Sequence, residues 1–237
     1  MIRFRPLLVP TVWFLFGFAI LTGLGVWQIQ RLGEKEALIA SVERGMRAAP
    51  VPLADALRDG AANAEYHHVR VTGHFLHEQE LYLFSRGPMG AVGADVITPL
   101  VQQSGETLLV DRGFVPDALR DPKTRAVAQT AGDVTLTGVL RLSQAPGMFT
   151  PAANLQTRLW FVKDVPSMAA ALGMNVPLVL IEADATPNPG GWPLGGRTQV
   201  EFPNDHLQYA ITWFGLALAL LTVYLVYHRS RGRLSFG

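Results

Sequence analysis

The sequence predicts an α+β membrane protein, in which two transmembrane helices, one near each end of the chain, flank a mainly antiparallel β extracytoplasmic domain with a few short helices. Three observations predict it. Two long segments, Pro6 to Gln30 and Leu207 to Tyr227, contain no charged residue. Between them, apolar and polar residues alternate in several stretches, which is typical of half-buried strands. Arginines without any acidic residue occupy both ends of the chain.

The first uncharged segment lies between Arg5 and Arg31. At a helical rise of about 1.5 Å per residue, it is long enough to cross a hydrocarbon layer of about 30 Å. A cleavable signal peptide has a shorter apolar region and small residues around its cleavage site. Residues 7–30 are therefore predicted to form an uncleaved transmembrane helix. The sequence after it stays compatible with a helix as far as Gly45.

The distribution of charge predicts the topology. All 19 acidic residues lie between Glu34 and Asp205. The two ends carry arginines instead: Arg3, Arg5, Arg229, Arg231 and Arg233. Because short basic tails stay cytoplasmic, we expect cytoplasmic tails at 1–6 and 228–237, a second transmembrane helix at 206–227, and a periplasmic domain at 31–205. No Arg- and Ser-rich presequence precedes the first helix, which favours the inner membrane of a bacterium.

The middle of the chain is predicted to be mainly β. Val69, Val71, Gly73 and Phe75 alternate with polar residues, so one face of this strand is buried. Further strands are expected at 81–84, 94–101, 107–114, 134–142 and 176–182, with a hairpin turn at 103–105. Short helices are expected at 53–59 and after Asp164, which caps a helix that contains Pro166 and stops at Gly173.

Composition excludes several functions. The chain has no cysteine, so disulfides, thiolate metal sites and a thiol nucleophile are absent. A net charge of +1 gives no reason to expect nucleic acid as a partner. The sequence contains no GxSxG or HExxH motif and no nucleophile paired with a base, so we expect no enzymatic activity.

Four histidines crowd the first strand region, namely His67, His68, His74 and His77. A copper or zinc site needs two or three convergent imidazoles. His74 falls on the polar face of its strand, and His67 and His68 point in opposite directions if they are extended. Solvated surface histidines are the favoured interpretation, and a copper carrier is the alternative.

His206, at the start of the second apolar helix, is a candidate ligand. At about 100° per residue, it shares one helix face with five others: Tyr209, Ala210, Trp213, Ala217 and Tyr224. An imidazole above aromatic rings is suited to a flat, apolar cofactor. An interfacial histidine without a ligand is an equal alternative from the residues alone.

A second candidate group lies at the end of the first apolar segment. Trp27, Gln28, Arg31 and Lys35 share an arc of about 100° on a helix. For Trp27 an interfacial anchor is the simpler interpretation, because tryptophan gathers at membrane interfaces. On the same interpretation, the cations Arg31 and Lys35 follow the lipid headgroups.

Six motifs in order resemble the Surfeit-locus family of cytochrome c oxidase assembly proteins. They are Gly25-Val-Trp-Gln-Ile-Gln-Arg-Leu-Gly-Glu-Lys, Tyr66-His-His-Val-Arg-Val-Thr-Gly-His-Phe, Asp111-Arg-Gly-Phe-Val-Pro, Gly138-Val-Leu-Arg, Phe149-Thr-Pro-Ala-Ala-Asn and Asn204-Asp-His-Leu-Gln-Tyr-Ala-Ile-Thr-Trp-Phe. The likeness covers nearly the whole chain. Where family members often have Asn and Trp around Arg-Gly, this chain has Asp111 and Phe114.

The resemblance implies a non-enzymatic assembly factor of the respiratory chain, which binds haem a and delivers or inserts it into the catalytic subunit of a haem–copper oxidase. It implies His206 as the iron ligand, with haem a synthase and the catalytic subunit as partners. Haem also needs an apolar slot and cations for its propionates. Tyr209, Ala210 and Trp213 are suited to the slot, and Arg31 and Lys35 to the propionates. A cofactor-free scaffold for a maturing oxidase subunit is the alternative.

Overall fold

The computed structural model describes residues 2–198 and 204–236, and these divide into two compact units. The helical unit contains residues 2–41 and 204–236. The β unit contains residues 42–198.

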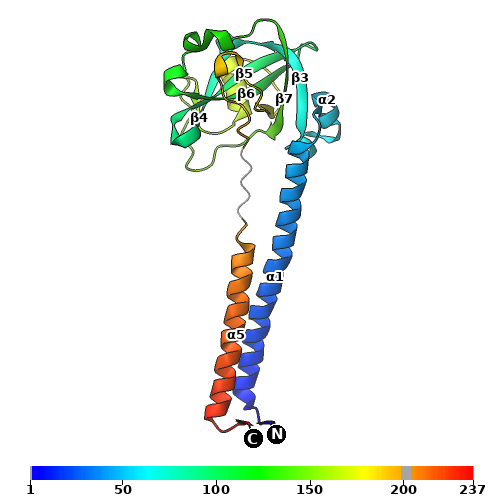
Figure 1. The fold of residues 1–237 in the computed structure, drawn as a ribbon, viewed down its shortest axis with the longest axis vertical. Helices are drawn as coiled ribbons and strands as arrows, with labels where there is room; N and C mark the ends of the chain where they lie inside the picture. Colours follow the sequence, from blue (N-terminus) through cyan, green and yellow to red (C-terminus); the bar gives the residue numbers. More distant parts are fainter. Residues whose placement is uncertain (1, 199–203, 237) are drawn as a thin grey trace. The chain divides into compact units, whose positions relative to one another are not determined.

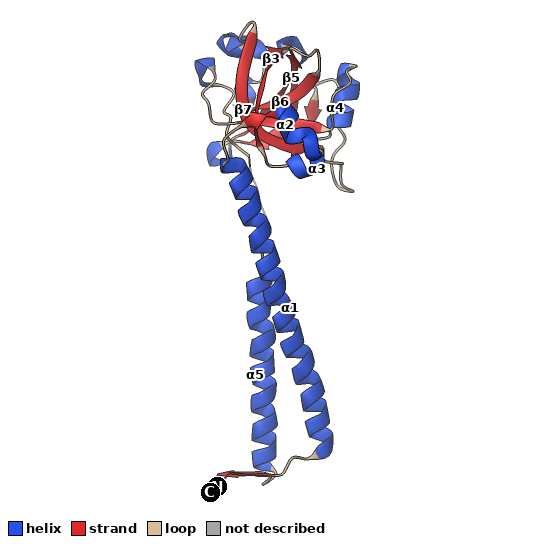
Figure 2. Cartoon of the chain, turned by 90° about the vertical axis from the view of Figure 1, so that its right-hand side faces the viewer, coloured by secondary structure: helices blue, strands red, loops and turns tan. Residues whose placement is uncertain are grey.

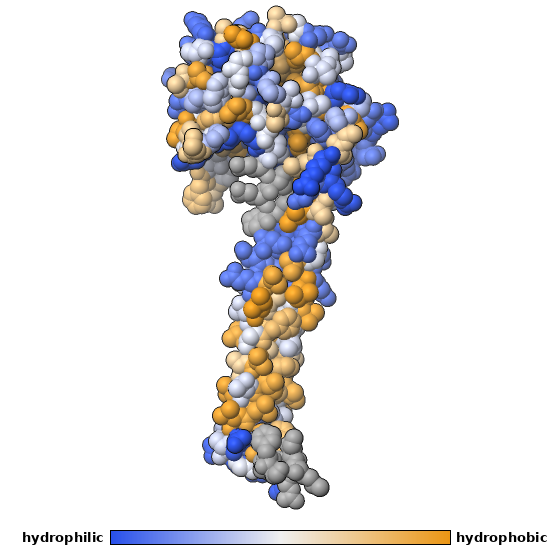
Figure 3. All heavy atoms as spheres, viewed as in Figure 1, coloured by the Kyte–Doolittle hydropathy of each residue, from blue (hydrophilic) through white to orange (hydrophobic). Residues whose placement is uncertain are grey.

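Two long helices dominate the helical unit. Helix α1 runs from Leu8 to Arg47 and helix α5 from His206 to Ser230. They lie side by side, and a short antiparallel ribbon of β1 (Ile2–Phe4) and β10 (Leu234–Phe236) joins their ends (Figures 1 and 2). Both helices are long and apolar enough to cross a membrane, and little of their apolar surface is buried. Figure 3 shows this apolar surface along the helices. The predicted pair of apolar terminal helices is confirmed, as is the continuation of the first helix to Gly45.

The β unit is mainly β, as predicted. Its strands are β2 (Val51–Pro52), β3 (His68–Phe75), β4 (Leu81–Arg86), β5 (Val92–Gln102), β6 (Thr107–Pro116), β7 (Asp133–Leu142), β8 (Leu159–Trp160) and β9 (Val179–Ala183). Its helices are α2 (Leu53–Ala56), α3 (Ala61–Ala64), α4 (Val165–Leu172) and 3-10 turns, of which the longest is Pro122–Ala128. β9 begins three residues later than the expected strand at 176–182.

The sheet closes into a barrel, which the sequence did not predict. Its strand order is β2-β3-β7-β9-β6-β5-β4-β8, and β5 also pairs with β3. β5 takes part in both pairings because different segments of the strand face different partners. The residues before Thr98 pair with β4, and Leu100 to Gln102 pair with β3. Strands β3, β7, β9, β6 and β5 therefore form a closed ring. Most pairs are antiparallel, but β9 lies parallel to β6.

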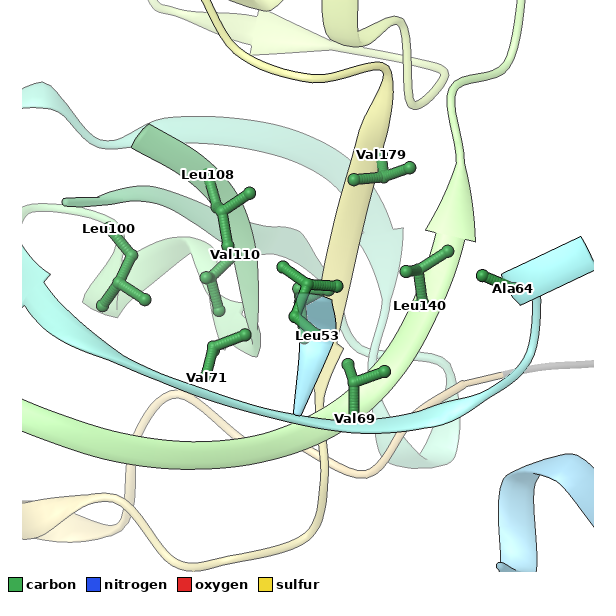
Figure 4. Close-up of a cluster of buried hydrophobic side chains, with 10 residues drawn as sticks. Leu53, Ala64, Val69, Val71, Leu100, Leu108, Val110, Leu140 and Val179 are labelled. Atoms are coloured by element: carbon green, nitrogen blue, oxygen red, sulfur yellow. The ribbon is translucent and has the colours of Figure 1, made fainter. Parts of the chain in front are cut away.

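Alternation along strand β6 directs its apolar side chains into different clusters of the core. Leu108 and Val110 of β6 point into the barrel, where they meet Val71, Leu140 and Ile181 (Figure 4). Burial of each such side chain stabilises the fold by about 1.5–3 kcal/mol. The intervening residues point outward. There Leu109 and Leu180 pack with Met168 of α4 and with Trp160 in a second cluster.

Helix α4, which covers the second cluster, has the predicted ends. The Asp164 carboxylate accepts a hydrogen bond from the Ser167 amide at 3.2 Å. Pro166 lies in the first turn, and Gly173 adopts the left-handed conformation that ends the helix.

Candidate functional site

The candidate ligand His206 is the first residue of α5, directly after the N-cap residue Asp205. Its Nδ1 atom lies 2.7 Å from Oε1 of Gln28 on α1. A carboxamide oxygen only accepts hydrogen bonds, so Nδ1 carries the proton and donates it. The lone pair of the neutral imidazole is then on Nε2. This is how ligand histidines are usually oriented, by a partner that holds the other ring nitrogen.

Close packing of the helices brings Gln28 and His206 together. Gly25, one turn before Gln28, is buried, and a Cβ atom built on it would lie 2.7 Å from the ring of Phe214. On α5 the buried positions are Ala210, Ala217, Tyr224 and His228. Small residues allow two helices to approach closely. The contact between Gln28 and His206 follows from this packing.

The helix face below His206 differs from the expected cofactor slot. Ala210 is only 1% exposed, and Ala217 and Tyr224 are also buried. Helix α1 covers this face, so Ala210 is not available to a ring lying against α5. Tyr209, by contrast, is 55% exposed, and Trp213 is half-buried. Of the residues predicted to form the slot, Tyr209 and Trp213 are therefore the ones that stay accessible.

The predicted cations follow Gln28 along α1. Arg31 lies over the ring of Trp27 at 5.8 Å and makes an exposed ion pair with Glu34 at 2.7 Å. Such exposed pairs contribute little free energy, so an anionic ligand can compete for Arg31. Lys35 is half-buried one further turn along the helix, and Trp27 is half-exposed.

The four histidines of the β unit have separate surroundings. His67 is exposed. His68 lies 3.0 Å from the Ala48 carbonyl and 3.6 Å from Asp184, and His74 lies 3.9 Å from Asp133. His77 contacts the Thr130 carbonyl and Arg112. Within the described ranges, no three His, Asp or Glu side chains are grouped so that they could hold a metal ion.

The Asp111-Arg-Gly motif joins two buried charge clusters that were not predicted from the sequence. On one side of β6, Arg112 and Arg125 share the carboxylate of Glu80. Burial alone would raise the pKa of Glu80, but His77, Arg125 and Arg112 outweigh it and lower the pKa. Arg112 pairs with the Glu80 carboxylate and donates a hydrogen bond from Nη2 to the Ala128 carbonyl.

On the other side of β6, Asp111 faces Asp95, Glu182, Lys163 and Arg197 around a cavity of about 30 Å³. Burial raises the pKa of Asp111 to about 8, and the neighbouring carboxylate of Asp95 adds to the shift while Lys163 opposes it. Asp111 is therefore mainly protonated at neutral pH. A protonated carboxyl group, like an Asn side chain, offers both a hydrogen-bond donor and an acceptor.

Sequence reasoning also missed His228, which is fully buried at the other end of α5. Its Nδ1 lies 2.9 Å from the Tyr224 carbonyl, and Tyr224 in turn stacks on Phe14 at 4.2 Å. The sequence did contain a sign of this role, because His228 directly follows the uncharged segment that ends at Tyr227. Ionisable residues near a membrane interior usually have a specific partner.

Comparison with known proteins assigns the chain to a family. A family model described as the SURF1 family matches residues 15–218. Surfeit locus protein 1 of Rattus norvegicus is 39% identical over 92% of this chain and 74% of the rat protein. SURF1-like proteins of Monosiga brevicollis and Rickettsia bellii are 37% and 33% identical, over 94% and 91% of this chain and 89% of each relative. Since the family model spans most of the chain and agrees with the order of the motifs, this chain belongs to the SURF1 family.

Proposed function

We propose that this chain is an assembly factor for haem–copper cytochrome c oxidase, which holds haem a through His206 and passes it to the catalytic subunit. It acts without catalysing a reaction, beside haem a synthase in the inner membrane of a bacterium. The β unit lies in the periplasm, and both termini lie in the cytoplasm. Membership of the SURF1 family and the two apolar helices support this role.

The hydrogen bond between Gln28 and His206 carries the proposal. It orients the imidazole and leaves the lone pair on Nε2, which is the atom that an iron ligand must present. A single histidine ligand suits a carrier, because a cargo held by one protein bond can be released to the next protein. When haem is bound, Nε2 of His206 would coordinate its iron.

The neighbouring residues fit the rest of a haem. The exposed flank of Tyr209 and Trp213 offers aromatic surface beside His206. Trp213 is seven residues from His206, or about 10 Å along the helix, which is close to the width of a porphyrin. Arg31 and Lys35 supply cations for the propionates on the other helix, with Trp27 as an aromatic neighbour of Arg31.

The test is the absorption spectrum and haem content of the chain, purified in detergent from cells that make haem a. Wild type should carry haem, His206→Ala should lose most of it, and His74→Ala should keep it. Trp213→Ala should change the spectrum with less loss of haem, and Arg31→Ala should weaken binding. Full haem content and an unchanged spectrum in a folded His206→Ala variant would eliminate His206 as the ligand.

A cofactor-free scaffold is the second candidate, and one observation favours it. Helix α1 covers the face of α5 that contains Ala210, Ala217 and Tyr224, so less apolar surface is open below His206 than the sequence suggested. Deleting the gene separates the two functions. Loss of haem a from the remaining catalytic subunit supports delivery, whereas a decrease of the subunit with its full haem content supports the scaffold. Loss of copper alone would favour a copper carrier.

A further inference from the structure

The β unit contains a cavity of about 220 Å³ that the proposed oxidase role does not use. It lies where β7 and β9 separate, beyond their last paired residues, Gly138 and Ala183. Thr130 and β7 residues 134–137 form one wall, and residues 183, 184 and 186–189 form the other. Phe75 of β3 and Arg112 of β6 complete the lining. An apolar cavity of about 150 Å³ holds a benzene molecule, so this one has room for a small organic molecule.

Arg112 supplies the charge at this cavity. Its side chain is only 3% exposed, and its guanidinium lies over the ring of Phe75 at 4.8 Å. Nη1 lies 3.2 Å from His77 Nδ1 and 3.6 Å from Glu80 Oε1. Nη2 donates to the Ala128 carbonyl at 2.6 Å and contacts Asn188 Oδ1 at 3.5 Å. Nε is buried and has no hydrogen-bond partner among the residues that the structure describes.

The charge of Arg112 is not fully compensated. Arg125 already holds both oxygens of Glu80, through Nη1 at 3.1 Å and through Nη2. Two guanidinium groups therefore face one carboxylate, and all three side chains are nearly inaccessible to water. Burial lowers the pKa of Arg112 to about 10, so the group is still charged at neutral pH. A buried, undercompensated guanidinium with an unused Nε–H is an anion-binding group.

The other charged residue that lines the cavity, Asp184, already has its own donors. Its Oδ1 accepts hydrogen bonds from the Thr186 amide and hydroxyl, and its Oδ2 accepts one from the Thr137 hydroxyl. His68 lies 3.6 Å from Oδ2. Although burial opposes the shift, these hydrogen bonds lower the pKa of Asp184, which shows that its negative charge is stabilised locally. Arg112 is the lining residue that still requires an anion.

The remaining lining combines apolar side chains with threonines and Asn188. Phe75, Val134 and Leu136 pack against the barrel core, and Pro187 and Pro189 line the opposite side. An inorganic anion would satisfy Arg112 but would leave this surface without a partner. A neutral apolar molecule would leave the charge without one.

We propose that this cavity binds a small organic carboxylate, with its carboxylate on the guanidinium group of Arg112 and its apolar body between Phe75 and the β7 residues Val134 and Leu136. Barrel mouths are common ligand sites, and a planar guanidinium matches a carboxylate through two parallel hydrogen bonds. The bound carboxylate replaces the long contact with Asn188.

The experiment uses benzoate as the probe and the full-length chain in detergent. Binding is measured by calorimetric titration and by the rise in unfolding temperature. Benzyl alcohol has the ring but no carboxylate, so it tests whether binding needs the charge. Inorganic phosphate has the charge but no ring, so it tests whether binding needs the apolar body. Wild type should bind benzoate saturably and at least about tenfold more tightly than either comparison compound, since one charge-assisted hydrogen bond is worth at least that factor. Equal binding of benzyl alcohol or of phosphate, or no saturable binding of benzoate, would overturn the proposal.

Two variants locate the site. Arg112→Lys keeps the charge beside Glu80 but loses the planar fork, so benzoate affinity should fall about tenfold or more. Val134→Phe fills the cavity without altering any charge and should abolish binding. Val92→Phe adds the same ring at a half-exposed position of β5 outside the cavity, and should bind as wild type does. Wild-type affinity in a folded Val134→Phe variant would refute the site, whatever the Arg112 variant does.

Discussion

The Nε2 atom of His228 accepts a hydrogen bond from the backbone N–H of Leu7 at 3.1 Å. Leu7 directly precedes α1, so a side chain of α5 caps the first turn of the other helix. The first N–H groups of a helix have no partner within the helix and usually receive one from a nearby Ser, Thr, Asp or Asn. Here an imidazole does this from more than two hundred residues away along the chain.

Replacing His228 by Ala should loosen the helix pair at this end. The Leu7 N–H would lose its acceptor in a partly buried position, which costs up to about 1–3 kcal/mol. Thermal unfolding in detergent should therefore begin at a lower temperature. His67→Ala removes an exposed imidazole and serves as the control. Equal unfolding temperatures for the two variants would contradict a capping role.

Replacing Gln28 by Leu should weaken haem binding without removing the ligand. His206 loses the acceptor that holds Nδ1, so its ring turns more freely, and losses of about 10- to 100-fold are typical of such outer contacts. Spectroscopic haem titration measures the effect. Gln30→Leu, at an exposed position of the same helix, should leave the affinity unchanged. Unchanged binding in Gln28→Leu would mean that the Gln28 contact is not needed for ligation.

Glu80→Gln should destabilise the β unit by about 3–5 kcal/mol, the usual result of leaving buried charges without their partner. Because the pKa of Glu80 is lowered in the fold, its stabilising effect is present above its unfolded pKa near 4.5 and is lost as the pH falls through the folded value. Chemical denaturation at neutral pH measures the loss. Glu78→Gln, which alters an exposed neighbour, should change little, and similar stability of the two variants would disprove the role of Glu80.

Asp111→Asn should stabilise the β unit increasingly as the pH rises. The folded pKa of Asp111 is about 8, against 3.8 as the ordinary value, so the folded state retains a proton that the unfolded state releases. Wild-type stability therefore falls relative to Asp111→Asn between about pH 4 and pH 8. Unfolding temperatures at the two ends of this range test the difference. The surface variant Asp117→Asn should show no such trend, and a parallel pH profile for Asp111→Asn would refute the assignment.

Reporter fusions test the proposed topology. A reporter that is active only in the periplasm should be active after Tyr66 or Gln129 and inactive at Gly237. The physical reason is the arginine content of both ends. Activity of the Gly237 fusion, or inactivity of the Gln129 fusion, would reverse the orientation.

Features that depend on nearby residues were predicted from the sequence. The uncharged runs predicted the apolar helices, and Asp164, Pro166 and Gly173 predicted both ends of α4. Closure of the barrel depends on the pairing of Leu100 to Gln102 with β3, and a strand pattern does not specify its partners. The site shows the same limit. Gln28 and His206 were both singled out, but their contact joins residues far apart in the chain.

The order of strands in the barrel has a consequence for biosynthesis. β9 lies between β6 and β7 in the ring, yet it is the last of the five barrel strands to leave the ribosome. Until Val179 to Ala183 are available, β6 and β7 each present an unpaired edge, which is a site for pairing with other chains. The barrel therefore forms late and through non-local pairings, which are slow. A nascent chain that stops before β9 therefore cannot close the ring.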